Sequence, residues 1–541
     1  MYFAYKKLID NLKLYENIII YGVGQYAREI YPIIVKYGLK DKILCFAQSQ
    51  DNEIKTFDGI CVKNIASLDC DAGKTVVLIA VSKLYVDELV ETSLACGFHD
   101  MVKLVDYELS ERQYNEQIEE KFAYFHTFEE YCEAIAEWYV EEHTEKCRKE
   151  MIVQSLLDRS CVNKVDTNQI VMICGHFSSR TVKIASALKK KNMDVTLLDY
   201  SYQETVWNSK ELNDLEIPIN KCRCIEEFLY MLLQFTPLVY FFEPRWSDCK
   251  WAAIVLKFKK CFGKIALGLY DVMNYEYIGI DEEKLKNEKY ALENADGIVW
   301  RWFAKEYLEE KGFQYSGKSI QFPDYCKYEH KQERIGDINT EVVKLCLVGG
   351  NGNMYVDSRE YSTDYSDFAR IDEILDIIGN RKDCCFHFYA GWLSDKNIER
   401  CKQYERVYNN FKFYIGTEHG QLVEKLADYD YGCEFWGYEK MPEPPKDIPM
   451  GKYYGSMYHD CIRNAFFDYI SAGLAIVTTQ SSKLWDFLEP YNIVIKMDLY
   501  NLDMNYLIKG KKHYKEIAKL VRNKLDIDEN ITKLIRFFGE L

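Results

Sequence analysis

Two aspartates late in the sequence, Asp460 and Asp468, have the spacing of acids that act together. They stand eight residues apart in a segment that predicts a helix. Eight residues is a little over two turns, so both side chains fall on nearly the same face. Gly473 follows as a typical helix C-cap, and the apolar run 475–479 predicts a buried strand directly after it. An acid pair alone is usually two solvated side chains, but the glycine, the strand and the α/β units upstream favour a binding site.

The arrangement resembles the sugar-nucleotide site of the two-Rossmann (GT-B) glycosyltransferases. In that family two glutamates stand eight residues apart and a glycine follows the second by five. Here both acids are aspartates and the spacing is the same. The resemblance implies that Asp468 accepts hydrogen bonds from the ribose hydroxyls, and that Asp460 approaches the donor sugar or its phosphates. Arg463 could neutralise the phosphates, or it could pair with Asp460 on the same helix.

A glycine-rich turn follows the apolar strand predicted at 342–348. Its residues are Gly349, Gly350, Asn351 and Gly352. Small residues let the backbone approach a diphosphate closely, and the resemblance implies that this turn cradles the donor. The family often places Arg or Lys directly after the turn, whereas here Arg359 or Arg370 would have to reach back. Further along, Gly416 and Thr417 resemble the strand–glycine–helix element that frames the nucleobase.

A histidine lies in a loop of the middle α/β unit. His176 stands between a strand predicted at 169–174 and a helix predicted at 179–190. In GT-B enzymes the matching loop faces the cleft near the acceptor, so His176 is a candidate to touch the reacting sugar. Ser178 is of a residue type that caps helices, and we expect it to cap this one.

Two acids follow other strands of the same unit. Asp271 comes after the strand predicted at 264–269, and it is a candidate polar contact or catalytic base. The alternative for Asp271 is a helix N-cap. Glu243 comes after the strand predicted at 238–242 and is a weaker candidate of the same kind.

Near the start of the sequence, Gly22 and Gly24 follow an apolar strand and open a helix, the context that a dinucleotide-binding turn requires. Free N–H groups at a helix start favour an anion. The acid expected after the second strand is missing from 46–48, so tight ribose binding is not favoured. The segment resembles the Rossmann-like domain of bacterial sugar-modifying enzymes, on Gly22, Gly24, residues 58–62 and the Gly-Phe pair at 97. A bound nucleotide and a structural or docking role both remain open.

Alternating strands and helices predict an α/β fold with doubly wound parallel sheets. We expect a Rossmann-like unit over 1–108, a helical connector over 109–165, a second Rossmann-like unit over 166–335 and a third over 340–541. The resemblance implies that the last two units form a GT-B glycosyltransferase with a cleft between them. The donor would then bind the last unit and the acceptor the middle one.

Composition excludes several classes of protein. At 541 residues with a net charge of −16, the chain is too long for one core and too acidic for a nucleic-acid binder driven by phosphate contacts. Its 19 cysteines are scattered and form no C-x-x-C pair, which indicates reduced core thiols. No apolar stretch approaches the ~18 residues of a membrane span. We expect a cytoplasmic protein, with peripheral contact at the inner face of the plasma membrane left open.

These observations predict a glycosyltransferase that moves a sugar from a nucleotide sugar to a glycan, lipid-linked or protein-linked acceptor in bacterial surface-polysaccharide or glycoconjugate assembly. No metal or other cofactor is required in principle. One alternative is an NAD-dependent nucleotide-sugar oxidoreductase or epimerase that uses the first unit. Against it stands the missing acid. The other alternative is a non-catalytic binding module derived from a glycosyltransferase.

Overall fold

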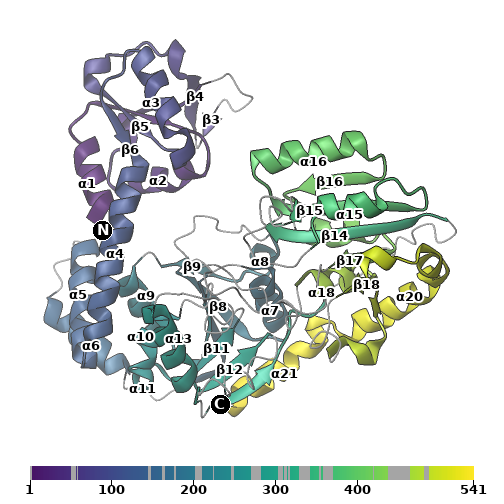
Figure 1. Cartoon of the computed structure of the whole chain (residues 1–541). Helices are drawn as coiled ribbons and strands as arrows, with labels where there is room; N and C mark the ends of the chain where they lie inside the picture. The colour runs from purple at the N-terminus through teal and green to yellow at the C-terminus, as the bar shows by residue number, and fades with distance from the viewer. Residues whose placement is uncertain are drawn as a thin grey trace. The chain divides into compact units, whose positions relative to one another are not determined.

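Contacts divide the chain into two compact bodies, whose elements carry the labels of Figure 1. The first body comprises Met1–Val162, Tyr200–Trp207 and Cys222–Gln234, and the second comprises Asn163–Asp199, Asn208–Lys221 and Phe235–Leu541. The computed structural model describes residues 3–49, 56–57, 59–143, 148–160, 165–175, 178–200, 210–222, 224–244, 249–269, 282–301, 309, 313–314, 317–327, 341–351, 355–356, 369–417, 419–435, 464–479 and 487–541.

A six-stranded sheet forms the core of the first body. Its strands are β1 (Asn17–Tyr21), β2 (Ile43–Gln48), β3 (Thr56–Phe57), β4 (Ile60–Asn64), β5 (Thr75–Ile79) and β6 (Met101–Lys103), in the order β3-β4-β2-β1-β5-β6. Neighbouring strands are parallel except β3 and β4 at one edge. Ile18 and Ile20 of β1 join one apolar cluster and Ile19 joins the other. The continuous apolar run is therefore buried on both faces, as a parallel sheet requires.

Helices complete the first body. They are α1 (Phe3–Leu12), α2 (Gln25–Lys36), α3 (Val86–Ala95), α4 (Leu104–Tyr124), α5 (Phe128–His143), α6 (Lys149–Ser160) and α9 (Ile225–Leu232). The rings of Trp138 and Tyr139 on α5 lie 5.9 and 5.0 Å from that of Tyr230 on α9. The sequence analysis placed α9 in the unit 166–335. These aromatic contacts explain why α9 groups with the first body instead.

The second body contains two sheets. The sheet that comes earlier in the chain, called the second sheet, has seven strands. They are β7 (Asp166–Cys174), β8 (Asp194–Asp199), β9 (Ile219–Lys221), β10 (Pro237–Glu243), β11 (Ile265–Leu269), β12 (Gly297–Trp300) and β13 (Lys318–Gln321). All pairs are parallel, in the order β13-β12-β11-β10-β7-β8-β9. Its helices are α7 (Ser179–Lys190), α8 (Lys210–Asp214), α10 (Lys250–Leu256), α11 (Lys259–Phe262) and α13 (Glu282–Asn294).

The third sheet has six strands, again all parallel. They are β14 (Val343–Asn351), β15 (Cys384–Trp392), β16 (Phe411–Ile415), β17 (Tyr431–Glu434), β18 (Ala475–Thr478) and β19 (Val494–Lys496), in the order β16-β15-β14-β17-β18-β19. Its helices are α15 (Ile371–Ile378), α16 (Asp395–Val407), α17 (His419–Leu426), α18 (Asn464–Ser471) and α20 (Met504–Lys524). The predicted α/β fold with parallel sheets is thus confirmed.

The last helix, α21 (Ile527–Glu540), returns to the second sheet and packs on α7 and β10 (Figure 1). The rings of Phe538 and Phe241 lie 5.2 Å apart, and a β-carbon on Gly297 would meet Leu541 at 2.8 Å. The N–H of Ile527 donates to the carbonyl of Cys326 at 2.8 Å. The sequence predicts a third unit over 340–541, and the last helix of that range packs on the second sheet.

The strand order of each sheet in the second body reverses at one place. The chain enters the second sheet at β7, which lies between β8 and β10, and enters the third at β14, which lies between β15 and β17. Because the connections on the two sides diverge there, the carboxyl ends of the two central strands leave room for a ligand. The carboxyl ends of β7 and β10, and those of β14 and β17, are therefore the expected binding edges.

Two features hold across the described parts of the chain. Each cysteine among them is a free thiol, as the scattered spacing predicted. In those same ranges no helix combines the length and the apolar character needed to cross a membrane.

Candidate functional site

The switch point of the third sheet is built from small residues. A β-carbon at Gly349 would lie 2.7 Å from the ring of Tyr355, so a larger residue there would displace the ring. Gly350 is exposed, and a β-carbon there would meet no atom of the described residues within 4 Å. On the neighbouring strand, a β-carbon at Gly391 would lie 2.7 Å from the carbonyl oxygen of Gly350. The backbone at the end of β14 is thus packed on one side and open beside Gly350.

Helix α18 is fastened across this switch point by Tyr469. Its hydroxyl accepts the N–H of Val348 on β14 at 2.8 Å and donates to the carbonyl of Cys433 on β17 at 3.2 Å. Gly432 makes room for the ring, since a β-carbon there would lie 2.1 Å from it. The helix gives way to Gly473, whose φ of +78° is the left-handed conformation that favours glycine, and the buried strand β18 follows. The predicted helix, glycine and strand are confirmed for residues 464–478.

Asp468, the residue before Tyr469, is 5% exposed. Its Oδ1 accepts a hydrogen bond from Nζ of Lys183 at 3.2 Å. The same ammonium lies 3.4 Å from the carbonyl oxygen of Tyr325. The resemblance implies that this carboxylate serves a ribose, and no partner for it within the protein follows from the sequence. The structure gives it a buried cation from α7, which belongs to the second sheet.

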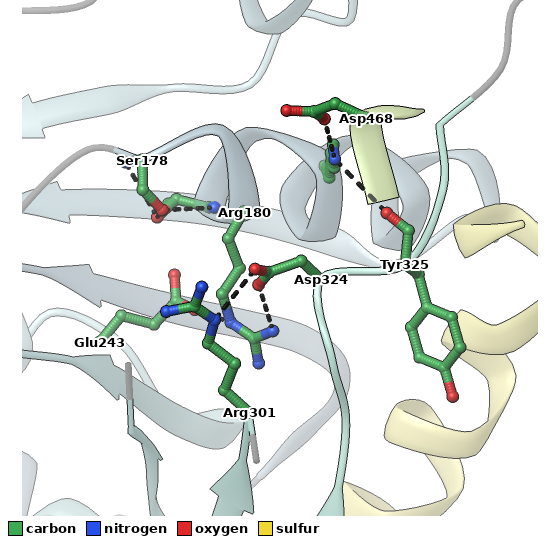
Figure 2. A network of polar contacts seen from close by, with 9 residues as sticks. Ser178, Arg180, Glu243, Arg301, Asp324, Tyr325 and Asp468 are labelled. Carbon is green, nitrogen blue, oxygen red and sulfur yellow. Dashed lines mark hydrogen bonds and ion pairs between the residues drawn. The ribbon is translucent and has the colours of Figure 1, made fainter. Parts of the chain in front are cut away.

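The second sheet fills its switch point with charged side chains (Figure 2). Arg180, in the first turn of α7, donates to Glu243 at the end of β10 at 3.3 Å and to Asp324 after β13 at 2.9 Å. Arg301 after β12 lies 3.1 Å from the other oxygen of Asp324. All four side chains are buried, and Arg180 and Asp324 are only 1% exposed. We call these four residues the arginine–acid network.

The charges of the arginine–acid network balance when both acids are ionised, because two guanidinium groups face two carboxylates. Burial raises the pKa of the Glu243 carboxyl, and the charge of Arg180 opposes that rise. Among the residues that the structure describes, no hydrogen-bond partner reaches the buried Nη2 of Arg180 or Oε2 of Glu243. The sequence offers Glu243 as a weaker candidate polar contact or catalytic base, and in the structure its Oε1 accepts a hydrogen bond from Arg180.

Helix α7 begins with a side-chain cap at Ser178. Ser178 Oγ accepts the N–H of Thr181 at 3.3 Å, and the side chain of Thr181 in turn accepts the N–H of Ser178 at 3.4 Å. The predicted cap at Ser178 is confirmed. It fixes the first turn of α7, and with it the direction in which Arg180 and Lys183 leave the helix.

The nucleobase element expected after β16 is partly described. Gly416 has φ of +66°, and its N–H donates to the carbonyl of Ala390 at 3.0 Å. This positive φ explains the glycine, since other residues rarely adopt it. Thr417 follows in the described chain. Whether the two residues frame a base stays a prediction.

Several predicted site residues lie outside the described residues. They are His176, Asp271, Gly352, Asp460 and Arg463. Of the predicted donor residues, Gly349, Gly350 and Asn351 end β14, and Asp468 lies on the helix fastened to that strand by Tyr469.

Backbone packing explains why the turn after β1 in the first body contains Gly22. Gly22 has φ of +127°, and a β-carbon there would lie 2.6 Å from the carbonyl oxygen of Ala80. Gly24 precedes α2 and has open space around it. At the end of β2, Gln48 is buried and the hydroxyl of Ser49 lies 2.7 Å from that of Tyr21. Close packing of β1 on β5 thus accounts for Gly22 without a ligand.

Sequence reasoning missed Lys183, Asp324 and Arg301. One signal was available for the first of them. In the predicted helix 179–190, Arg180 and Lys183 fall at helical spacing with the apolar Ile184 and Ala187, so they lie on the stripe that should face the core. Charged residues on such a stripe indicate buried ion pairs, which the structure then provides.

Known proteins are similar to this chain in the arrangement of their strands and helices, at low sequence identity. No family model and no curated protein matches it. Among solved structures, HepE of Anabaena in complex with UDP-glucose is 10% identical, with a TM-score of 0.45 over 68% of this chain and 99% of that one. The lipopolysaccharide outer core galactosyltransferase WaaB is 12% identical, with a TM-score of 0.42 over 69% and 100%. Sucrose-phosphate synthase of Thermosynechococcus elongatus is 10% identical, with a TM-score of 0.45 over 68% and 98%.

At these identities and scores, the fold assignment rests on the molecule itself. The second body has two parallel doubly wound sheets, each with one switch point, and a final helix that returns to the earlier sheet. This is the two-Rossmann, or GT-B, architecture that the sequence predicted.

Proposed function

We propose that this chain is a glycosyltransferase whose donor is a nucleotide sugar. The observation that carries the proposal is the carboxyl edge of the third sheet. There Gly350 leaves open space at the switch point, and Tyr469 fastens the helix that carries Asp468 across the same two strands. An open backbone at the switch point and a buried acid on the helix fastened across it suit a ligand that has both a diphosphate and a diol.

In this proposal each part of the donor has a partner. The backbone around Gly349, Gly350, Asn351 and Gly352 approaches the diphosphate, because small residues let N–H groups come close to an anion. Asp468 accepts hydrogen bonds from the ribose hydroxyls, while Gly416 and Thr417 frame the base. Asp460 and Arg463 serve the sugar and the phosphates. Catalysis then relies on positioning and on stabilising the departing diphosphate, and the proposal needs no metal ion.

The acceptor side of the proposal belongs to the second sheet. His176 and Asp271 would contact the reacting hydroxyl of a glycan, lipid-linked or protein-linked acceptor. We place the reaction in bacterial surface-polysaccharide or glycoconjugate assembly, on the cytoplasmic side, with peripheral contact at the membrane where the acceptor is a lipid. Nucleic acid is not a partner in this proposal, because the net charge is −16.

A thermal-shift screen tests the donor site. Wild type, Asp468→Asn and Asp430→Asn are each screened with nucleoside diphosphates, nucleotide sugars and NAD. Asp430 is the matched control, since it forms an ion pair with Lys511 at 2.9 Å. Both residues belong to the part of the chain that comprises the third sheet and its helices, which we call the third-sheet half; the second sheet and its helices are the second-sheet half. A ligand that binds the folded state raises the melting temperature by mass action.

We expect one nucleotide family to raise the melting temperature of wild type and of Asp430→Asn, and to lose this effect in Asp468→Asn. A response to NAD alone that both variants retain would move the ligand to the first body and overturn the proposal. Hydrolysis of the nucleotide sugar then separates an enzyme from a binding module. An active enzyme releases nucleoside diphosphate, and Asp468→Asn abolishes the release.

A further inference from the structure

Lys183 is a buried lysine that joins the two halves of the second body. It projects from α7 of the second-sheet half, is 1% exposed, and its Nζ lies 3.2 Å from Oδ1 of Asp468 on α18 of the third-sheet half. A buried ammonium is costly unless it is paired and hydrogen-bonded. The carbonyl of Tyr325 at 3.4 Å supplies a second acceptor. The ammonium is thus held from two sides, and it holds the carboxylate in turn.

The chain around this pair is also fixed. The N–H of Lys327 donates to Oγ of Ser471 on α18 at 3.2 Å, and Nζ of Lys327 donates to Oγ of Ser186 on α7 at 2.9 Å. Cys326 pairs with the start of α21 through backbone hydrogen bonds of 2.7 and 2.8 Å. Segment 324–327 therefore lies between α7, α18 and α21, and it keeps Lys183 and Asp468 facing one another.

We propose that Lys183 is a positioning residue for ribose recognition: its ammonium fixes Asp468 through Oδ1 in the orientation that accepts the hydroxyls of a nucleotide donor. This inference rests on the proposed function. A carboxylate has about four lone-pair sites, so the bond to Lys183 does not by itself exhaust what it can accept. Figure 2 shows one oxygen of Asp468 on the dashed contact and the other directed away from it.

The proposal has a consequence for the two halves. The acid belongs to the half expected to bind the donor, whereas the cation that orients it belongs to the other half. Ribose recognition is therefore complete only when α7 and α18 are together. Donor affinity then depends on a residue of the acceptor-side half that itself does not touch the donor.

A second buried lysine provides a matched control. Nζ of Lys511 lies 2.9 Å from Asp430 and 2.6 Å from the carbonyl of Val342. These two partners precede β17 and β14, so the pair lies at the amino edge of the third sheet. Removing either lysine should destabilise the fold, but only the loss of Lys183 should change how ribose is recognised.

The test compares binding of ribose and dideoxyribose ligands by isothermal titration calorimetry. The probes are ADP, CDP, GDP and UDP, each with its 2′,3′-dideoxy form. The proteins are wild type, Lys183→Met, Lys183→Arg and Lys511→Met. Lys183→Gln, which keeps an N–H donor, gives a second measurement if the Met variant does not fold.

We expect wild type to prefer the ribose form of its nucleotide by roughly tenfold or more, because hydrogen bonds to a charged group are among the stronger ones. The preference should fall below about threefold in Lys183→Met and Lys183→Gln, return at least in part in Lys183→Arg, and persist in Lys511→Met. A full preference in Lys183→Met would overturn the inference and leave the proposed function standing. A wild type that binds none of the probes would overturn both.

Discussion

The carboxyl edges of the second and third sheets differ in what occupies their switch points. At the second sheet, Arg180 and Asp324 stand at the centre of a buried network of four charged side chains. At the third sheet, Gly349 and Gly350 end the central strand, and the second of them faces open space. The same topology therefore supports an edge closed by its own ion pairs and an edge left open for a ligand.

The difference between the two carboxyl edges has a physical cause. Buried charges that pair with one another fix the elements that carry them. A glycine backbone places no side chain between its N–H groups and an incoming anion. The molecule thus uses one edge for rigidity and, in our proposal, the other for the donor. Lys183 links the two, because it leaves α7 one turn after Arg180 and ends on Asp468.

The largest effect is expected from breaking the arginine–acid network. Asp324→Asn keeps the shape of the side chain but leaves two buried guanidinium groups facing one acid. Removing one partner of a buried ion pair costs about 3–5 kcal/mol, so thermal unfolding followed by circular dichroism should begin at clearly lower temperature. Asp383→Asn is the control, since its partner Arg381 is partly exposed and such pairs contribute less than about 1 kcal/mol. Equal losses in the two variants would contradict the description of this edge as closed.

The two adjacent glycines of the third sheet sharpen the comparison. Gly349→Ala drives a β-carbon against the ring of Tyr355, and overpacking of this kind costs about 1–3 kcal/mol of stability. Gly350→Ala should change stability by less than about 0.5 kcal/mol, yet weaken nucleoside diphosphate binding about tenfold by placing a methyl group where the phosphates approach. Melting curves and calorimetric titrations measure the two quantities. If Gly350→Ala binds as tightly as wild type, the open space is not the diphosphate site.

The third-sheet half should lose stability on the acid side. Burial, with Lys412 and Lys344 nearby, lowers the pKa of His387 to about 4. The unfolded chain titrates near 6.5, so it binds a proton more readily than the folded chain, and stability falls as pH drops from about 6.5 to about 4. His387→Gln should remove about 1–2 kcal/mol of this pH dependence, a range that allows for solvent screening of a partly exposed ring. The free energy of unfolding is measured for both proteins across this pH range. If it falls as steeply with pH in the variant as in wild type, His387 is not the group responsible.

The second-sheet half should respond in the opposite sense, with the smallest effect. Burial raises the pKa of Glu243, so the folded chain holds this proton more tightly than the unfolded chain does. Stability is therefore lost as pH rises from the ordinary glutamate value of about 4.3 to the raised value. Glu243→Gln cannot ionise, and its stability relative to wild type should grow with pH over that window. Urea titration at each pH measures the free energy of unfolding of both proteins. A difference that stays constant with pH would show that Glu243 does not titrate in that window.

Sequence was sufficient for the sheets because their signals are local. Continuous apolar runs such as Ile170–Cys174 predicted buried parallel strands, and the serine before the 179–190 helix predicted its cap. Gly473 and the strand after it were also correct, since a positive φ at a helix end selects glycine. These features depend on neighbours within a few residues.

The remainder depends on partners far away in the chain. The amphipathic pattern of α21 says that one face is buried, but it does not say which sheet covers that face. Lys183 and Asp468 are separated by 285 residues, so no spacing rule connects them. Glu243 was a candidate polar contact because it follows a predicted strand, yet whether such an acid is open or paired depends on Arg180 from another element.

Hydrogen–deuterium exchange with and without the nucleoside diphosphate tests the central claim most directly, since it locates a ligand among the carboxyl edges. The account predicts slower exchange in peptides that cover residues 343–351, 411–417 and 464–479, with no change in peptides from β1 and α2 of the first body. Protection confined to residues 17–36, with the third-sheet edge unchanged, would contradict the account and place the ligand on the first sheet.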